Sequence, residues 1–231
     1  MSYALLIPAA GKGERLGAPV SKALVSLNGK PLIWWALNAF IDDSRLKQII
    51  VATSQENQAD LKQSLTEHPL AKLIVTTLGG ATRQDSVGRA LDSVTASVDH
   101  VLVHDAARPF VTRTLIDAVL KALTESAAAL PGVAVTDTIK RVDSKQIVTE
   151  TLPRNELFAA QTPQGIRTEL FRTAHRLAYE QHVQCTDDVA LIEKFRLGTV
   201  KLVAGDSRNL KITHPHESPR AEELLRGFNL T

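Results

Sequence analysis

The sequence predicts an α/β fold in which a doubly wound, mostly parallel sheet carries helices on both faces and a β-hairpin projects from it. Short apolar runs alternate with amphipathic helical segments over the first half of the chain. A polar segment of alternating character follows, as is typical of a hairpin. With 231 residues and 44% hydrophobic content the chain can bury one sizeable core, and we expect a single domain over residues 1–231.

Four apolar runs rich in leucine and β-branched residues are predicted to be central parallel strands, buried on both faces. They cover residues 3–7, 48–52, 72–76 and 100–103. The connecting helices are expected near residues 31–40, 55–67, 83–94 and 112–123, the last with Thr112 as its N-cap. Right-handed crossovers between parallel strands then place helices on both faces of the sheet.

The pattern changes after about residue 126. Residues 127–136 predict another core strand, and residues 137–154 predict a hairpin with its turn at 143–145. A hairpin this polar buries little by itself, so we expect it to project as an arm. The remaining predicted elements are helices near 168–179, 187–194 and 217–225 and short strands at 200–203 and 210–213.

Composition and charge exclude several classes of protein. Net charge is +2, from 27 basic and 25 acidic side chains, which argues against a dedicated binder of duplex nucleic acid. The single cysteine, Cys185, excludes an intramolecular disulfide and a cysteine-based zinc site, and it fits a reducing cytoplasm. We expect no signal peptide and no membrane span, because no apolar run approaches the ~18 residues that a span needs.

A glycine-rich loop, residues 8–17, directly follows the first predicted strand. Gly11 and Gly13 would let backbone N–H groups approach an anion, and Ala9 and Ala10 would leave room for a flat base. The loop also has positive charge beside it, from Lys12, Arg15 and Lys22. The spacing matches neither a dinucleotide fingerprint nor a Walker loop. A tight turn whose glycines serve geometry alone is the alternative.

A second glycine pair, Gly79 and Gly80, lies between the third strand and the next helix. Such a position at a helix N-terminus suits a polar ligand, and Ser86 in the first helical turn can hydrogen-bond a base edge. The alternative is a glycine turn capped by Asp85 and Ser86.

Asp105 ends the fourth predicted strand, where open α/β sheets bind ligands. Its carboxylate suits Mg²⁺, which shares its coordination shell with waters and phosphates. Two alternatives are an Asp105–Arg108 pair that ties the loop together and a His104–Asp105 catalytic pair, for which no nucleophile is found. The later polar residues, taken one by one, are typical of solvated faces or caps, and His214 and His216 are interpreted as part of a loop.

Together and in order, these motifs resemble the 2-C-methyl-D-erythritol 4-phosphate cytidylyltransferase family of the non-mevalonate isoprenoid pathway. The resemblance spans essentially the whole chain. The matching residues are Ala9-Ala10-Gly11-x-Gly13-x-Arg15, Lys22, Gly79-Gly80-x-x-Arg83-x-x-Ser86, Val103-His104-Asp105-Ala106-Ala107-Arg108-Pro109, Asp137-Thr138-x-Lys140, Arg154, Gln161-Thr162-Pro163-Gln164, Thr186-Asp187-Asp188 and Lys211-Ile212-Thr213.

The resemblance implies a Rossmann-like sheet of the nucleotide-diphospho-sugar transferase type and a homodimer whose β-arms embrace the partner. It implies that CTP and methylerythritol phosphate react, with Mg²⁺ or another divalent cation, to give the CDP-alcohol and pyrophosphate. A substrate phosphate oxygen attacks the α-phosphorus in line, so catalysis is mostly positioning and charge stabilisation.

The resemblance also implies roles for single residues. Arg15 and Lys22 neutralise the α-phosphate and the leaving pyrophosphate, and Arg154 and Lys211 hold the attacking phosphate. Asp105 holds the metal, with Asp206 as a second candidate, and Arg154 completes the partner's site. Residues expected to bind the nucleotide are Ala9, Ala10, Gly11, Gly13, Gly79, Gly80, Arg83, Ser86, Asp105 and Ala106. Those expected around the alcohol are Arg108, Thr138, Thr162 and Thr186.

The chain departs from the family pattern at two places. Ala81 stands where the family often has an acidic residue, and Pro19-Val20-Ser21 precedes Lys22, which usually follows a proline directly. The ribitol-5-phosphate cytidylyltransferases share two motifs but typically have valine in place of Ala107 and lack the Thr-Asp-Asp run. A non-catalytic nucleotide sensor on the same fold is the other alternative, although a sensor need not gather four cations around one triphosphate.

Overall fold

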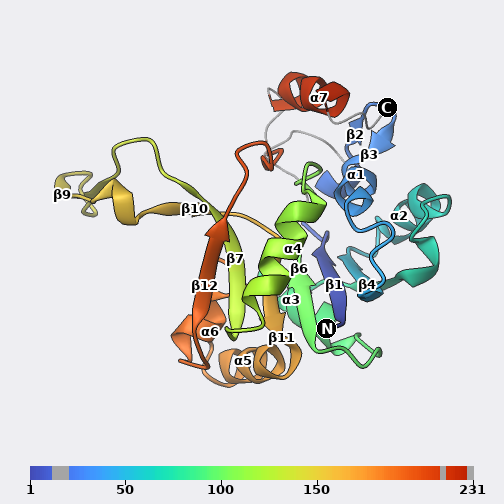
Figure 1. Cartoon of the computed structure of the whole chain (residues 1–231), viewed down its shortest axis with the longest axis horizontal. Helices are drawn as coiled ribbons and strands as arrows, with labels where there is room; N and C mark the ends of the chain where they lie inside the picture. Colours follow the sequence, from blue (N-terminus) through green and yellow to red (C-terminus); the bar gives the residue numbers. More distant parts are fainter. Residues whose placement is uncertain (12–20, 214–216, 228–231) are drawn as a thin grey trace.

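A central sheet organises the molecule (Figure 1), and the computed structural model describes residues 1–11, 21–213 and 217–227. Within this part the main sheet has eight strands. In spatial order seven of them are β10 (Phe158–Ala160), β7 (Ala128–Ala134), β11 (Gln164–Arg167), β6 (His100–Val103), β1 (Tyr3–Pro8), β4 (Leu46–Thr53) and β5 (Ile74–Leu78). The eighth strand, β12 (Val200–Ala204), pairs with β7.

The strand pairings confirm a mainly parallel sheet. β1 is parallel to β4 and β6, β5 is parallel to β4, and β12 is parallel to β7. The sequence interpretation missed β10 and β11, which introduce the antiparallel pairings. β11 runs antiparallel to both β6 and β7 and joins the two halves of the sheet.

Helices cover both faces of the sheet, as predicted (Figure 1). Tyr3, Leu5 and Ile7 of β1 pack into one core with α1 (Leu32–Asn38), α2 (Gln58–Leu65) and α4 (Arg113–Ala122). The intervening Ala4 and Leu6 pack into a second core with α3 (Arg83–Asp92), α5 (Thr168–Glu180) and α6 (Ala190–Lys194). This alternation follows from the two-residue period of a strand.

Some predicted boundaries were wrong. Residues 71–73 form a 3₁₀ turn, η3 (Ala71–Leu73), so the strand expected at 72–76 begins at Ile74. α6 begins three residues later than expected, and the Asp187 carboxylate accepts a hydrogen bond from the N–H of its first residue, Ala190 (3.1 Å).

The strand predicted at 210–213 is absent. This stretch has no strand pairing; the Ile212 N–H binds the Ala107 carbonyl (2.8 Å). Ile212 is buried in a third apolar cluster with Trp35, Phe110 and α7 (Ser218–Gly227). The apolar residues of the stretch 210–213 therefore pack in this cluster and do not form a strand. Near this cluster lie η2 (Lys22–Leu24), β2 (Ser26–Leu27) and β3 (Lys30–Pro31).

The predicted hairpin projects from the sheet as an arm (Figure 1). It consists of β8 (Lys140–Val142) and β9 (Val148–Thr151), which are antiparallel, followed by η4 (Arg154–Glu156). The Asp143 carboxylate accepts from the Lys145 and Ile147 N–H groups and fixes the turn. All residues of β8 and β9 are exposed. Among the described helices, none combines the length and the apolar character of a membrane span.

Candidate active site

A cleft of about 690 Å³ opens at the carboxyl ends of β1 and β6. Loops that are far apart in the sequence meet there: the chain after β1, the loop between β5 and α3, the loop after β6, and the stretch around Lys211. The predicted site residues that line the cleft are Ala9, Ala10, Gly11, Lys22, Gly80, Arg83, Ser86, Asp105, Ala106 and Lys211. Gly13 and Arg15 lie outside the described residues.

The two glycines after β5 allow a close approach of loop and helix. A Cβ at Gly79 would lie 2.3 Å from the Ala10 Cβ, and one at Gly80 would lie 2.2 Å from the Asp85 Cβ. Thr82 and Asp85 form a capping box at the start of α3. Ser86 accepts from the Gly80 N–H (3.1 Å) and donates to the Thr82 carbonyl (2.9 Å). The loop thus has a fixed shape in which Ser86 is partly engaged.

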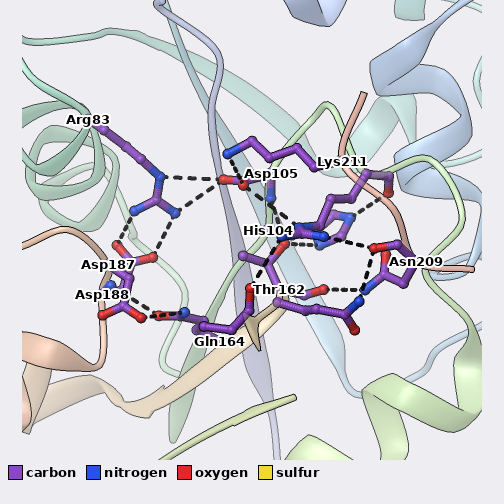
Figure 2. Close-up of polar contacts among 12 residues, drawn as sticks. Arg83, His104, Asp105, Thr162, Gln164, Asp187, Asp188, Asn209 and Lys211 are labelled. Atoms are coloured by element: carbon purple, nitrogen blue, oxygen red, sulfur yellow. Dashed lines mark hydrogen bonds and ion pairs between the residues drawn. The ribbon is translucent and has the colours of Figure 1, made fainter. Parts of the chain in front are cut away.

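Asp105 lies among three cations, two of which, Arg83 and Lys211, are labelled beside it in Figure 2. Its carboxylate lies 3.2 Å from Arg83 Nη2, 2.7 Å from Lys211 Nζ and 3.9 Å from Arg108 Nε. Burial alone would raise the pKa of Asp105, but the neighbouring Arg83, Lys211 and Arg108 hold it well below its usual range. The carboxylate is therefore ionised at neutral pH.

Arg83 links Asp105 to a second buried carboxylate that the sequence interpretation did not assign to the site. Its guanidinium makes two hydrogen bonds to Asp188, Nη1–Oδ1 at 3.0 Å and Nη2–Oδ2 at 2.8 Å. Figure 2 shows Arg83 spanning the two aspartates. This paired geometry fixes the guanidinium plane at the wall of the cleft.

His104 is fully buried behind Asp105, and both of its ring nitrogens are engaged. Nε2 contacts the Arg108 carbonyl (3.1 Å), which can only accept, so Nε2 carries the proton. Nδ1 then accepts from Thr162 Oγ1 (2.9 Å), and that oxygen accepts from the Asp105 N–H (3.1 Å). Burial lowers the pKa of His104 to about 4. His104 thus supports the loop as a neutral side chain, and its ring has no free nitrogen for a catalytic pair with the Asp105 carboxylate.

Arg108 and Thr162 are close to the cleft but are engaged in holding its walls. Arg108 donates to the carbonyls of Asn209 (2.8 Å) and Ala160 (3.4 Å), and burial lowers its pKa. Thr162 is buried between His104 and Asp105. Asp206 pairs with Arg208 (2.7 Å).

Three predicted substrate residues are exposed, and none of them is among the described residues that line the cleft. Thr138 and Arg154 belong to the arm, and Thr186 lies in the loop before α6. Arg154 Nη1 donates to the Thr136 carbonyl (3.0 Å) at the base of the arm. Within one chain, the structure does not bring Arg154 together with the cleft residues.

Sequence reasoning also missed several residues that support the cleft. Asp188, Gln161, Gln164 and Asn209 are all buried. The first three lie in motifs that carried the resemblance, but nothing local distinguishes a buried amide that holds a loop from a solvated one. Across residues 1–11, 21–213 and 217–227, no three His, Cys, Asp or Glu side chains converge to hold a metal ion.

Comparison with known proteins places this geometry in a family. The family model for 2-C-methyl-D-erythritol 4-phosphate cytidylyltransferase (IspD) matches residues 3–227. The enzyme of that name from Bacillus mycoides is 42% identical over 96% of this chain and 97% of its own. The crystal structure from Thermus thermophilus has a TM-score of 0.78 at 37% identity, covering 98% of this chain and 100% of that one. The Anaerococcus prevotii 4-diphosphocytidyl-2C-methyl-D-erythritol synthase has a TM-score of 0.86 at 25% identity, over 97% and 98%. On the combined agreement of motifs, fold and full-length similarity, the chain belongs to the 2-C-methyl-D-erythritol 4-phosphate cytidylyltransferase family.

Proposed function

We propose that the cleft is the active site in which this cytidylyltransferase transfers CMP from CTP to 2-C-methyl-D-erythritol 4-phosphate and releases pyrophosphate. The observation that carries the assignment is the convergence of two glycine-containing loops, Asp105 and two lysines on one cleft at the carboxyl edge of the sheet.

The nucleotide occupies the side of the cleft formed by the two glycine loops. Cytosine lies against Ala10, Gly80 and Ser86, where small side chains leave space for a flat ring. Gly11 and Lys22 face the triphosphate. Gly13 and Arg15, which the family resemblance assigns to the same phosphates, lie outside the described residues. Ala81 lines the cleft without an acidic group, so it supplies no carboxylate contact to the base.

The acceptor phosphate occupies the side formed by Asp105 and Lys211. An ionised phosphate is already a nucleophile near neutral pH, so its attack on the α-phosphorus needs no general base. Lys211 holds this phosphate, while Lys22 and Arg15 stabilise charge on the α-phosphate and on the leaving pyrophosphate. Arg108, Thr162 and Thr186 shape the acceptor side around the alcohol.

A divalent cation, Mg²⁺ in the simplest case, is part of the proposal. Asp105 is an ionised carboxylate at the cleft wall, and Mg²⁺ is commonly held by one or two carboxylates with waters and phosphate oxygens. The donor type therefore fits the ion, with Asp105 as its protein ligand, although Oδ1 and Oδ2 of Asp105 are paired with Arg83 Nη2 and Lys211 Nζ in this structure. When bound, it would neutralise phosphate charge.

The arm is proposed to join a second copy of the chain. It exposes Val142, Ile147 and Val148, which lack a core of their own, and it carries Thr138 and Arg154 outside the cleft. A homodimer would place Thr138 and Arg154 at the acceptor side of the partner's cleft. Location in the cytoplasm, predicted from the single cysteine, belongs to the same proposal.

The experiment that tests this function is a matrix of pyrophosphate release. Each of the four nucleoside triphosphates is incubated with Mg²⁺ and with either methylerythritol 4-phosphate or ribitol 5-phosphate. We expect release with CTP and methylerythritol phosphate, because a site built to pair with a base edge rejects bases that leave its polar groups unpaired. Equal turnover with ATP or GTP would refute the base pocket, preference for ribitol phosphate would favour the sister activity, and binding of CTP without turnover would indicate a sensor.

A further inference from the structure

Residues 161–164, which connect β10 to β11 and include the first residue of β11, contact three separate parts of the cleft wall. Thr162 supports the loop after β6, as described above. Gln161 and Gln164, on either side, hold the other two parts. We propose that Gln161 is a positioning residue, which holds the Lys211 segment at the acceptor side of the cleft. The contacts of Gln164 show the same arrangement at the Thr186–Asp188 loop. This inference rests on the proposed function.

Gln161 holds the turn that leads to Lys211. Its Oε1 accepts from the Asp206 N–H (3.2 Å), and its Nε2 donates to the carbonyls of Asp206 (2.8 Å) and Asn209 (3.3 Å). Its own backbone N–H donates to the Pro131 carbonyl of β7 (2.8 Å). The Gln161 side-chain amide therefore connects the turn at residues 206–209 to the sheet through hydrogen bonds to backbone groups.

Asn209 continues this connection toward the reacting groups. It is fully buried, and its Nδ2 donates to the Thr162 carbonyl (2.9 Å) while its own carbonyl accepts from Arg108 (2.8 Å). Lys211 follows two residues later, with Nζ 2.7 Å from the Asp105 carboxylate. Figure 2 shows Asn209 beside Thr162, and Lys211 reaching Asp105. The place of the Lys211 ammonium thus depends on the turn that Gln161 holds.

Gln164 holds the loop before α6 through its side-chain amide. Its Oε1 accepts from the N–H groups of Asp188 (3.0 Å) and Val189 (3.1 Å), and its Nε2 donates to the Asp187 carboxylate (3.1 Å). Asp188 in turn holds Arg83, which contacts Asp105. Loss of Gln164 would therefore move both the acceptor loop and the arginine.

Neither glutamine is among the described residues that line the cleft, so each acts through the segment that it holds. Both side chains are buried: Gln161 is 6% exposed and Gln164 is 2% exposed. Truncation would leave backbone groups without partners in a buried place, where such groups are costly. The described contacts of Gln161 reach the Lys211 segment and not the glycine loops that form the nucleotide side. The predicted effect is therefore on the acceptor rather than on CTP.

The test compares Gln161→Ala with Gln48→Ala, a matched control. Gln48 in β4 is also buried, and its Oε1 accepts from the N–H groups of Thr95 (3.0 Å) and Ala96 (3.1 Å). It thus holds a loop in the same way, but its contacts do not involve the cleft. We expect Gln161→Ala to lower kcat/KM for methylerythritol phosphate by about tenfold or more, because ångström-scale misplacement of a binding group is costly. KM for CTP should change by less than about twofold, and Gln48→Ala should lower thermal stability with both constants unchanged.

A second variant, Gln161→Glu, guards against a simple loss of folding. Its carboxylate can accept from the Asp206 N–H, but when ionised it would face the carbonyl oxygens of Asp206 and Asn209. Protonation restores a donor, so its activity relative to wild type should recover as the pH falls, which Gln161→Ala should not do. Equal changes in the constants for CTP and for the acceptor, or no recovery of Gln161→Glu at low pH, would overturn the positioning role.

Amide hydrogen exchange separates this inference from the proposed function. In Gln161→Ala, residues 205–213 should exchange faster than in wild type, while Gln48→Ala should leave them unchanged. Wild-type protein that shows no transfer to methylerythritol phosphate would contradict the proposed function, whatever the exchange result. Active wild type with unchanged exchange at 205–213 in Gln161→Ala would contradict the inference alone.

Discussion

The sheet and the arm of this molecule are built in opposite ways. In β1, five consecutive residues are buried, and the cleft at its carboxyl end is lined by loops that the sheet holds in place. In β8 and β9 every residue is exposed, and the hairpin is held by its own ladder, its turn and pairs such as Arg141–Glu150 (3.0 Å). Burial thus fixes the cleft within one chain, whereas a two-stranded hairpin gains little stability from burial of its own.

This difference separates two groups of predicted site residues. Asp105 and Lys211 are already paired in the isolated chain. Arg154 and Thr138 are exposed on the arm, where Arg154 contacts the Thr136 carbonyl. We therefore expect changes in the cleft to affect catalysis directly and changes in the arm to act through association with a second copy.

The largest effect is expected in the cleft. Lys22→Ala should lower kcat by about 10²–10³, the usual effect of removing one group that stabilises charge in the transition state. Circular dichroism and the unfolding temperature should remain close to wild type. A near-normal kcat would contradict the role assigned to Lys22.

On the arm, Arg154→Ala should lower kcat/KM for methylerythritol phosphate by about 10–10²-fold, the range expected for one charge-assisted contact. Arg154→Lys should restore part of this, since lysine keeps the charge but not the paired geometry. Arg141→Ala is the matched control, because Arg141 lies on the same arm and pairs with Glu150. Equal losses in Arg141→Ala and Arg154→Ala would indicate a general effect of arm charge.

The apolar surface of the arm should matter for association rather than for folding. Ile147 and Val148 are 59% and 55% exposed in the single chain. Replacing both with serine should change unfolding stability of the monomer by less than about 1 kcal/mol. The dissociation constant of the proposed dimer should rise about tenfold or more, because loss of buried methylenes weakens an interface. Sedimentation at several concentrations measures this, and an unchanged dissociation constant would remove these residues from the interface.

The smallest effect concerns how the folding stability of the sheet and its helices depends on pH. Burial lowers the pKa of His175 in α5 to about 4, from an ordinary value of 6.5. The unfolded chain therefore binds a proton that the folded chain excludes, so stability is full above pH 6.5 and is lost as the pH falls toward 4. His175→Phe should flatten this dependence by a few degrees in the unfolding temperature. If the unfolding temperature of His175→Phe fell between pH 6.5 and 4 as steeply as that of wild type, the lowered pKa of His175 would be contradicted.

The sequence was most informative where a local pattern decides the structure. The apolar runs at 3–7, 48–52 and 100–103 belong to strands that are buried on both faces, and the polar hairpin is exposed. Each of these sequence patterns follows directly from burial or from its absence. β10 and β11 were missed because Phe158–Ala160 is entirely exposed and Gln164 is a polar residue inside the sheet. Their pairing is set by distant strands. The stretch at 210–213 has strand-like apolar residues, but its partners are α7 and Trp35 rather than a strand.

The candidate site divides in a similar way. The glycines and Asp105 could be predicted to line the cleft because their residue types and their place after strands indicate a ligand-binding edge. Lys211 was predicted only through the family resemblance, because alone it is typical of a solvated face. Asp188 and Asn209 could not be predicted, because their importance lies in contacts with Arg83, Arg108 and Thr162, which only the folded chain brings together.

Mixing two impaired variants tests most directly whether the arm of one subunit completes the cleft of the other. Arg154→Ala and Lys22→Ala proteins are purified separately, their subunits are exchanged, and the mixed dimer is confirmed by native mass spectrometry before pyrophosphate release is measured. A shared site leaves one intact site in each mixed dimer, so random exchange should restore about a quarter of wild-type activity. Confirmed mixed dimers that are no more active than the two parents would contradict the shared site.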